Sequence, residues 1–172
     1  ADPPGTLRSR FAMTPLDTRG VIYLDGNSLG ALPAATVSRI EGVVADEWGI
    51  GVIRSWNDAG WIDLPDRVAE KIARIIGAGP GEVVVADSTT INLYKVLHAA
   101  MSIARADDRR RSVLLSESGN FPTDLYIASS VARALGLEMR LVESGNMTAR
   151  VDAGVAILLL THLDYCTRWL ER

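Results

Sequence analysis

Two groups of polar residues in this sequence follow apolar runs and precede helix-like segments. Ser88, Thr89 and Thr90 offer hydroxyl groups beside the unpaired backbone amides of an expected helix N-terminus, a combination that suits a phosphate group. Ordinary helix capping uses the same residue types and is the competing interpretation. Phe121, within the run Asn-Phe-Pro-Thr-Asp of residues 120–124, could hold a flat ring over a hydroxyl-lined pocket, and an ordinary turn is the alternative there.

A third position after an apolar run is the pair Thr161 and His162, where the histidine would also fit a purely structural role. Farther toward the N-terminus, Trp48, Trp56 and Trp61 gather in one stretch of a chain whose aromatic content is only 6%. These tryptophans either pack into a core or form a wall for a flat substrate.

The order of apolar runs and amphipathic segments predicts how these positions come together. Continuous apolar runs that alternate with helical patterns indicate an α/β fold with a mostly parallel sheet flanked by helices. In this class, ligands gather at the carboxyl ends of the strands, which is where the three polar positions lie. The expected strands are residues 82–86, 112–116, 138–142 and 155–161, and the expected helices begin near residues 33, 65, 88 and 123.

The chain is expected to comprise two parts. Residues 1–48 form an N-terminal arm, extended over residues 1–20, and a first helix, whereas residues 49–172 belong to a larger domain. The apolar run 155–160 looks like a central strand, yet only eleven residues follow Thr161, too few for a further helix and strand. We therefore expect the larger domain to be incomplete within these 172 residues.

Composition argues against several classes of function. Eighteen basic and twenty-one acidic residues give a net charge of -3, so nucleic acid is not an expected partner. One cysteine, Cys166, and two histidines provide no set at metal-ligand spacing. No apolar run approaches the roughly 20 residues of a membrane span and no signal pattern is visible, which predicts a cytoplasmic protein with no membrane partner. Nucleophile-elbow, Walker and dinucleotide-binding motifs are missing too, which leaves a phosphate-bearing cofactor.

Five ordered blocks, spread over about residues 21–167, together resemble kynureninases, which are pyridoxal 5'-phosphate enzymes. Each block alone is weak, and their order makes the resemblance specific. The blocks are Tyr-Leu-Asp-Gly-Asn-Ser-Leu-Gly at 23–30, Glu-Trp-Gly at 47–49 with Ile-Arg-Ser-Trp-Asn at 53–57 and Gly-Trp at 60–61, Asp-Ser-Thr-Thr-Ile-Asn-Leu at 87–93, Asn-Phe-Pro-Thr-Asp-Leu-Tyr-Ile-Ala at 120–128, and Leu-Thr-His at 160–162.

The resemblance implies a fold and a set of binding residues. It implies the aminotransferase-type fold (fold type I), with a mainly parallel large domain, a smaller C-terminal domain, and a homodimer that holds the cofactor near its interface. By resemblance, Thr89 and Thr90 bind the cofactor phosphate and Phe121 stacks on the pyridine ring. Related desulfurases and aminotransferases usually place a histidine on that ring, so Phe121 favours the kynureninase branch. The remaining implied residues are Pro122, Thr123, Asp124 and Thr161 at the cofactor, and Asn27, Ser28 and Trp56 at the substrate.

The implied reaction is the hydrolytic cleavage of the Cβ–Cγ bond of L-kynurenine to anthranilate and L-alanine in tryptophan catabolism. Whether 3-hydroxykynurenine is also a substrate stays open. In kynureninases the cofactor-binding lysine, the aspartate at the pyridine nitrogen and the arginine for the substrate carboxylate all come after the point that matches Arg172. Lys71 and Lys95 are the only lysines of this sequence, and neither matches the family lysine. We therefore expect an N-terminal part of a kynureninase that contains no catalytic residue and is inactive alone.

Other interpretations stay open beside this resemblance. The complete enzyme could be a class V aminotransferase or a cysteine desulfurase, which share the fold. The chain could also be a non-catalytic remnant, whose helix starts bind phosphate or whose sheet edge pairs with another chain.

Overall fold

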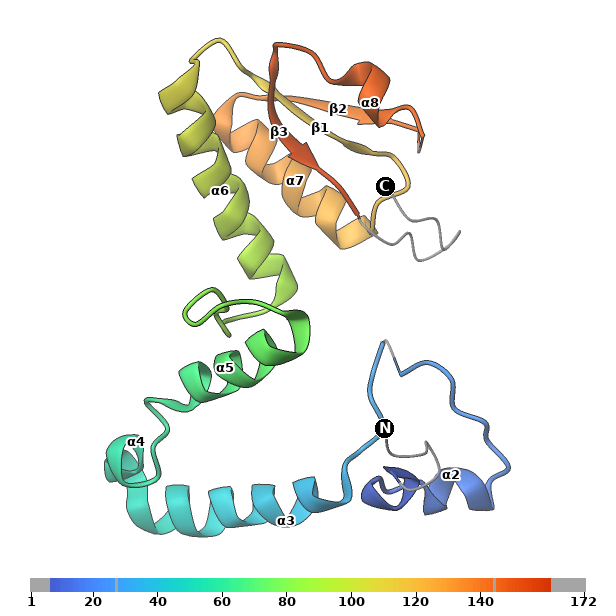
Figure 1. Cartoon of the computed structure of the whole chain (residues 1–172), viewed down its shortest axis with the longest axis vertical. Coiled ribbons are helices and arrows are strands. Elements are labelled where there is room, and N and C mark those ends of the chain that lie inside the picture. The colour runs from blue at the N-terminus through green and yellow to red at the C-terminus, as the bar shows by residue number, and fades with distance from the viewer. Residues whose placement is uncertain (1–6, 27, 144, 162–172) are drawn as a thin grey trace. The chain divides into compact units, whose positions relative to one another are not determined.

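The computed structural model describes residues 7–26, 28–143 and 145–161, which form two units divided between Val85 and Ala86 (Figure 1). Each unit is described by itself. The predicted boundary at residue 48 concerns the domains of the complete protein and stays a prediction. No helix within the described ranges combines the length and the apolar composition that crossing a membrane requires.

The first part of the N-terminal unit contains helical turns, where the sequence predicted an extended arm. A 3-10 turn, Arg8–Arg10, is followed by α2, Thr14–Thr18. The prediction was wrong here because Pro15 favours the first turn of a helix and the Arg8 guanidinium pairs with Asp17. After α2, the described residues 19–26 and 28–32 contain no helix or strand, and Pro33 forms an isolated antiparallel bridge with Phe11.

The predicted helix after Pro33 is present. It begins as α3, Ala34–Gly42, and continues as a π-helix, Val43–Gly51. A 3-10 turn, Val52–Arg54, and the short α4, Ser55–Asp58, follow directly. The turns bring Trp61 back to the π-helix, where its indole N–H donates a hydrogen bond to Glu47.

Helix α5, Leu64–Ile76, lies within one residue of its predicted start. Pro65 occupies its first turn, and Gly77 ends it in a left-handed conformation, with φ of 76°, that favours glycine. The segment 82–86 was predicted as a strand, and this prediction was wrong: Val84 is 83% exposed. Three valines give this segment strand propensity, but a strand also needs a neighbouring backbone, and none of the described residues pairs with it.

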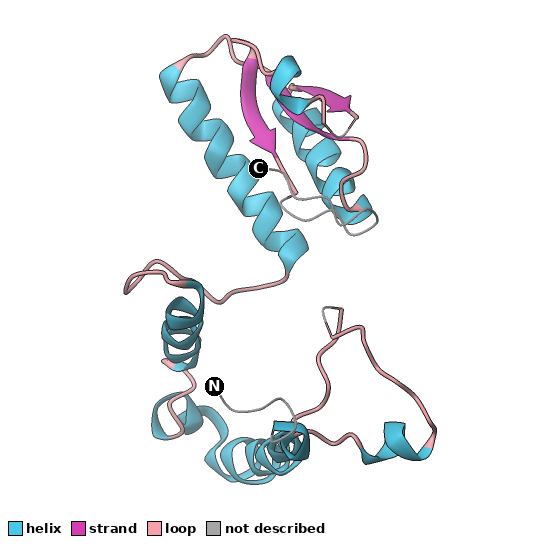
Figure 2. Ribbon diagram, turned by 45° about the vertical axis from the view of Figure 1, so that its right-hand side comes forward, coloured by secondary structure: helices cyan, strands magenta, loops and turns pink. Residues whose placement is uncertain are grey.

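The C-terminal unit is a three-stranded parallel sheet with helices on both faces (Figure 2). The strand order is β2-β1-β3, with Leu114 opposite Met139 on one side and Ile157 on the other. The elements are α6, Thr89–Asp107; β1, Val113–Glu117; α7, Pro122–Leu135; β2, Glu138–Val142; α8, Met147–Arg150; and β3, Val155–Leu159. The three strands, helix α7 and the start of α6 lie within two residues of their predicted positions, whereas the short α8 was not predicted.

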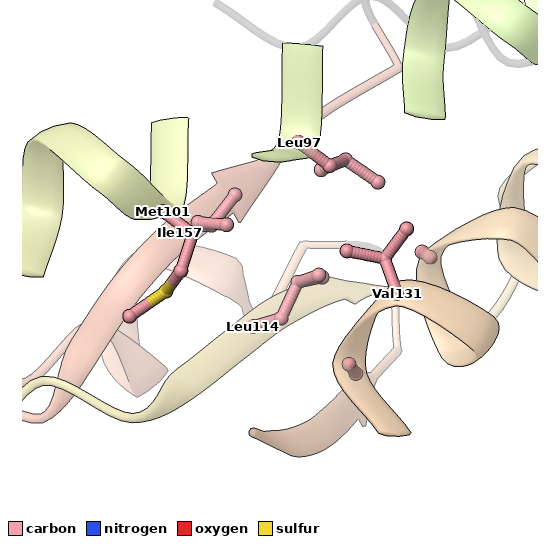
Figure 3. Packing of buried hydrophobic residues seen from close by; sticks show 7 residues of the cluster. Leu97, Met101, Leu114, Val131 and Ile157 are labelled. Atoms are coloured by element: carbon pink, nitrogen blue, oxygen red, sulfur yellow. The ribbon is translucent and has the colours of Figure 1, made fainter. Parts of the chain in front are cut away.

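The core of this unit lies between the sheet and two helices. Leu114 and Ile157 point from the sheet toward Leu97 and Met101 of α6 and Val131 of α7 (Figure 3). Alternate residues of a strand face opposite sides, so the neighbours of Leu114 pack against the other face, which α8 covers. This arrangement confirms the predicted α/β class and the coverage of both faces.

Strand β3 was predicted to be a central strand of a domain that is incomplete within these residues, and its place in the complete sheet stays a prediction. Its composition is typical of a central strand, but in the described sheet it lies at an edge, and Leu158 is 43% exposed. The central strand is β1, which is buried along its whole length.

Candidate functional site

The order of the strands reverses at one point of the sheet. From β1 the chain passes through α7 to β2 on one side, and it later returns through α8 to β3 on the other side. In open α/β sheets, ligands bind outside the carboxyl ends of the strands where the order reverses in this way. Here that point lies between the ends of β1 and β3, from which residues 118–121 and 160–161 leave the sheet. Two of the three predicted positions therefore meet at one edge.

Asn120 connects these two segments directly. Its side-chain oxygen accepts a hydrogen bond from the Phe121 backbone N–H at 2.6 Å and another from the Thr161 hydroxyl. Its amide nitrogen lies 3.2 Å from Ser116 Oγ, and this hydroxyl in turn donates to the Leu159 carbonyl at 3.1 Å. Asn120 is 4% exposed and Ser116 is fully buried. Phe121 and Thr161, which are far apart in sequence, are thus held by one side chain.

Phe121 stands at the start of α7 with its ring accessible. Its φ of -57° and ψ of 132° are extended values, and Pro122 follows in the first turn of the helix. Phe121 is 47% exposed. Asp124 lies in the same first turn, where a carboxylate is favoured by the helix dipole, and Thr123 is exposed beside it. The segment therefore presents an aromatic face, a hydroxyl and a carboxylate at one helix N-terminus.

Thr89 and Thr90 begin α6. Ser88 caps this helix, since its hydroxyl oxygen accepts a hydrogen bond from the Ile91 amide at 3.4 Å, so the capping interpretation is confirmed for Ser88. The start of α6 lies toward the end of the unit where β3 finishes and α7 begins (Figure 1). Thr89 and Thr90 thus lie toward the same end of the unit as Asn120, Phe121 and Thr161. Their role at a phosphate stays a prediction.

The predicted substrate residues belong to the N-terminal unit. Asn27 lies outside the described residues, as does His162. Ser28 donates a hydrogen bond to an Asp25 carboxylate oxygen at 2.8 Å, and the Tyr23 hydroxyl donates to the Leu29 carbonyl at 2.6 Å. These contacts hold Tyr23 and Asp25 close to Leu29 and Ser28.

The tryptophan region is organised around Glu47. The Trp61 indole N–H donates to a Glu47 carboxylate oxygen at 2.6 Å, and Arg39 pairs with the other oxygen at 2.7 Å. Hydrogen bonds from Arg39 and then Trp61 hold the pKa of the Glu47 carboxyl below its usual range. Trp56 meets Trp61 edge to face, with ring centroids 6.5 Å apart.

Exposure bears on the two interpretations of these tryptophans. Trp56 is 49% exposed and Trp48 is 65% exposed. Neither is a core residue of the described unit, so the core-packing interpretation is wrong for these two. The wall interpretation stays a prediction.

Two hollows on the described surface lie at other places. One has a volume of about 250 Å³ and borders α5, and another of about 380 Å³ lies at the end of β2. Among the side chains that the structure describes, no group of three or more His, Cys, Asp or Glu could hold a metal ion. The hollow beside α5 is lined by Asp66, Ala69, Glu70, Ala73, Gly81 and Val83, and the one at β2 by Arg140, Leu141, Val142, Glu143, Asn146 and Arg150.

Comparison with known proteins gives a consistent result. No model of a protein family matches the chain. Among curated proteins, it is 48% identical over 168 residues to a kynureninase of Pseudomonas fluorescens, an alignment that covers 96% of this chain and 39% of that protein. A kynureninase of Burkholderia pseudomallei is 43% identical over 99% of this chain and 41% of its own length, and one of Burkholderia mallei is 42% identical with the same coverage. The chain belongs to the kynureninase family.

Kynureninase membership confirms the resemblance and assigns the described sheet to the aminotransferase-type fold. The chain spans about two fifths of the length of the curated kynureninases it matches. Residue roles at the cofactor and the substrate remain predictions in this chain.

Sequence reasoning missed two residues, Asn120 and Ser116, of the hydrogen-bond network at the ends of β1 and β3. Asn120 was recognised only as part of the block 120–128, with no role of its own. Ser116 carried a visible signal, because it is a polar residue at the end of the apolar run 112–116 and such a residue needs a hydrogen-bond partner when buried. Each of the two has one partner near residue 160, Leu159 for Ser116 and Thr161 for Asn120, and no local sequence pattern reveals such distant partners.

Proposed function

We propose that the protein to which this chain belongs is a pyridoxal-phosphate-dependent kynureninase, which cleaves the Cβ–Cγ bond of L-kynurenine to anthranilate and L-alanine. The observation that carries this proposal is the 48% identity with the Pseudomonas fluorescens kynureninase over 168 residues. The meeting of Phe121 and Thr161 at the sheet edge supports it, because this edge is where the fold binds ligands.

The residues at this edge fit a cofactor that carries a flat ring and a phosphate. The half-exposed Phe121 offers a face for stacking, and the anchored Thr161 hydroxyl lies in the segment next to it. The N-terminus of α6, with Thr89 and Thr90 in its first turn, offers backbone amides and hydroxyls to a phosphate. When bound, pyridoxal phosphate supplies an electron sink for the carbanion formed at the substrate Cα.

Each group of this chain has a specific task in the proposal. Thr89 and Thr90 hold the phosphate and so fix the position of the cofactor at the sheet edge, while Phe121 fixes the orientation of its ring. Pro122, Thr123 and Asp124 shape the loop around that ring, and Asn27, Ser28 and Trp56 face the substrate.

The catalytic lysine is proposed to come from a segment outside these 172 residues. The ammonium group of Lys95 forms an ion pair with Asp87 at the start of α6, which supports a structural role for this lysine. We further propose that the complete protein is a cytoplasmic homodimer, as the family resemblance implies.

A segment exchange tests the proposed activity. The matching 168 residues of the Pseudomonas fluorescens kynureninase are replaced by this chain, and anthranilate release from L-kynurenine is followed by fluorescence. We expect turnover in the exchanged protein. Phe121→Leu should lower it at least tenfold, while the matched variant Tyr126→Leu, on the exposed side of α7, should stay within twofold. A folded exchanged protein that retains pyridoxal phosphate but releases no anthranilate would contradict the proposal.

The chain alone tests the role of its lysines. It is incubated with pyridoxal phosphate, reduced with borohydride and analysed by peptide mass spectrometry. We expect no stoichiometric adduct on Lys71 or Lys95. A stoichiometric adduct on Lys95 would overturn the assignment of the catalytic lysine to another segment. Equal thermal stabilisation by inorganic phosphate and by pyridoxal phosphate would favour a simple phosphate-binding module instead.

A further inference from the structure

The hydrogen bonds around Asn120 define a function for a residue with no assigned role. We infer that Asn120 is a positioning residue of the cofactor site, which ties the Phe121 loop to the end of β3 and makes the Thr161 hydroxyl a hydrogen-bond acceptor toward the ligand. This inference rests on the proposed function, because the ligand is the cofactor assigned there.

The orientation of the Asn120 amide follows from its partners. A backbone N–H can only donate, so the Asn120 atom 2.6 Å from the Phe121 nitrogen must be the oxygen. This oxygen carries no hydrogen, and the Thr161 hydroxyl must therefore donate to it. One side-chain oxygen thus accepts from a loop on β1 and from the segment after β3.

The rest of the network fixes the other end of the amide. The Asn120 nitrogen donates to Ser116 Oγ at 3.2 Å, and the Ser116 hydroxyl uses its own hydrogen for the Leu159 carbonyl at 3.1 Å. The donor and the acceptor of each hydrogen bond in this network are therefore fixed. Because Asn120 and Ser116 are almost completely buried, water cannot replace a lost partner without cost.

The direction of these bonds determines what Thr161 offers to a ligand. A threonine hydroxyl has one hydrogen and two lone pairs, and here the hydrogen is directed to Asn120. A ligand group that binds the Thr161 hydroxyl must then be a donor, such as a protonated nitrogen or a hydroxyl. A phosphate or phenolate oxygen at this position would find no hydrogen to accept.

The same network restrains Phe121 through its backbone. The residue is 47% exposed, so packing restrains it only in part, and the bond from its amide to Asn120 adds a second restraint. Loss of this bond should let the loop move while the buried strand β1 stays in place.

Hydrogen exchange of backbone amides in the full 172-residue chain tests the restraint. Asn120→Ala should speed exchange of the Phe121 amide at least tenfold and leave the Leu114 amide unchanged. Asn120→Asp keeps the acceptor oxygen for Phe121, and the Ser116 hydroxyl can turn its hydrogen from Leu159 to the second carboxylate oxygen, so this variant should preserve the slow exchange of Phe121. Asn146→Ala, at an exposed position that makes no capping bond to α8, is the matched control and should change neither amide. Exchange of Phe121 within twofold of the wild type in Asn120→Ala, or fast exchange in Asn120→Asp, would overturn the inference.

A titration with pyridoxal phosphate, followed by the amide shifts of Phe121 and Thr161, tests the connection with the cofactor. Asn120→Ala should raise the dissociation constant at least fivefold, and Asn146→Ala should leave it unchanged. Ser116→Ala removes only the hydrogen bonds of Ser116 and leaves the Asn120 side chain in place. It replaces Asn120→Ala if that variant does not fold, and it should raise the dissociation constant at least twofold. Unchanged affinity in the folded variant would overturn the positioning role. A wild-type chain whose amides do not respond would refute cofactor binding by this chain, whereas the exchange experiment still decides the restraint.

Discussion

The two units differ in what they bury. In the C-terminal unit, Leu114, Leu115 and Val131 are fully buried, and the sheet has a helix on each face. In the described part of the N-terminal unit, the buried residues are the small Ser55, Ala69 and Ala73. Large apolar side chains there lie at the surface, with Ile22 84% and Leu24 87% exposed.

This difference shows that the two units derive their order from different interactions. The C-terminal unit has an apolar core of its own, which burial stabilises. The N-terminal unit is organised locally by polar contacts, such as those of Glu47 with Arg39 and Trp61, while its apolar faces remain available for contacts with other protein segments.

Separating the units should have the largest effect. We expect residues 86–172 alone to unfold in one cooperative transition, because they contain the whole apolar core of the described sheet. Residues 1–85 alone should lose ellipticity gradually, without a transition. Urea titrations followed by far-UV circular dichroism measure both. A sharp transition in residues 1–85 would refute the comparison.

A matched pair of leucine substitutions tests, within the intact chain, whether the two units differ in the burial of large apolar side chains. Leu114→Ala removes a fully buried side chain and should lower the free energy of unfolding by about 2–5 kcal/mol. Leu24→Ala removes one that is 87% exposed and should change it by less than about 0.5 kcal/mol. Urea titrations of the three proteins provide the values, and similar losses in the two variants would mean that Leu24 is buried in solution.

The same difference explains how much of the fold was predictable from the sequence. Helix α7 and strand β2 were predicted to within one residue, because Pro122 and Gly136 mark the helix ends and the apolar pattern is continuous. The strand predicted at 82–86 failed because propensity is local and pairing is not. Strand prediction thus held where the unit has its own core.

The candidate site was predictable only in part. Phe121 and Thr161 were identified from blocks of sequence, and the parallel topology brought them to one sheet edge as expected. Asn120 could not be given a role, because its side chain joins positions 116, 121 and 161, and that contact exists only after β3 docks beside β1.

Two glycines at helix ends provide a smaller test. Gly136 ends α7 with φ of 67° and Gly77 ends α5 with φ of 76°, a conformation that costs alanine about 1 kcal/mol. Both added methyl groups would meet open space, so strain is the main effect. Gly136→Ala should lower the midpoint of the cooperative transition, whereas Gly77→Ala should reduce helicity without moving it. A shift of that transition by Gly77→Ala would show that α5 unfolds together with the sheet.

The smallest expected effect concerns Glu47, whose pKa is held below the usual value of 4.5 by hydrogen bonds from Arg39 and Trp61. A lowered pKa in the folded state means that the stabilisation is fully present above pH 4.5 and is lost as the pH falls through the folded-state pKa. Tryptophan fluorescence should therefore change in this acidic window while the amides of β1 remain protected from exchange. Glu47→Gln should abolish that change, and Glu41→Gln, on the exposed surface of α3, should retain it. An identical acid response in Glu47→Gln would mean that Glu47 does not organise the tryptophan region, and simultaneous loss of β1 protection would mean that the two units do not respond separately.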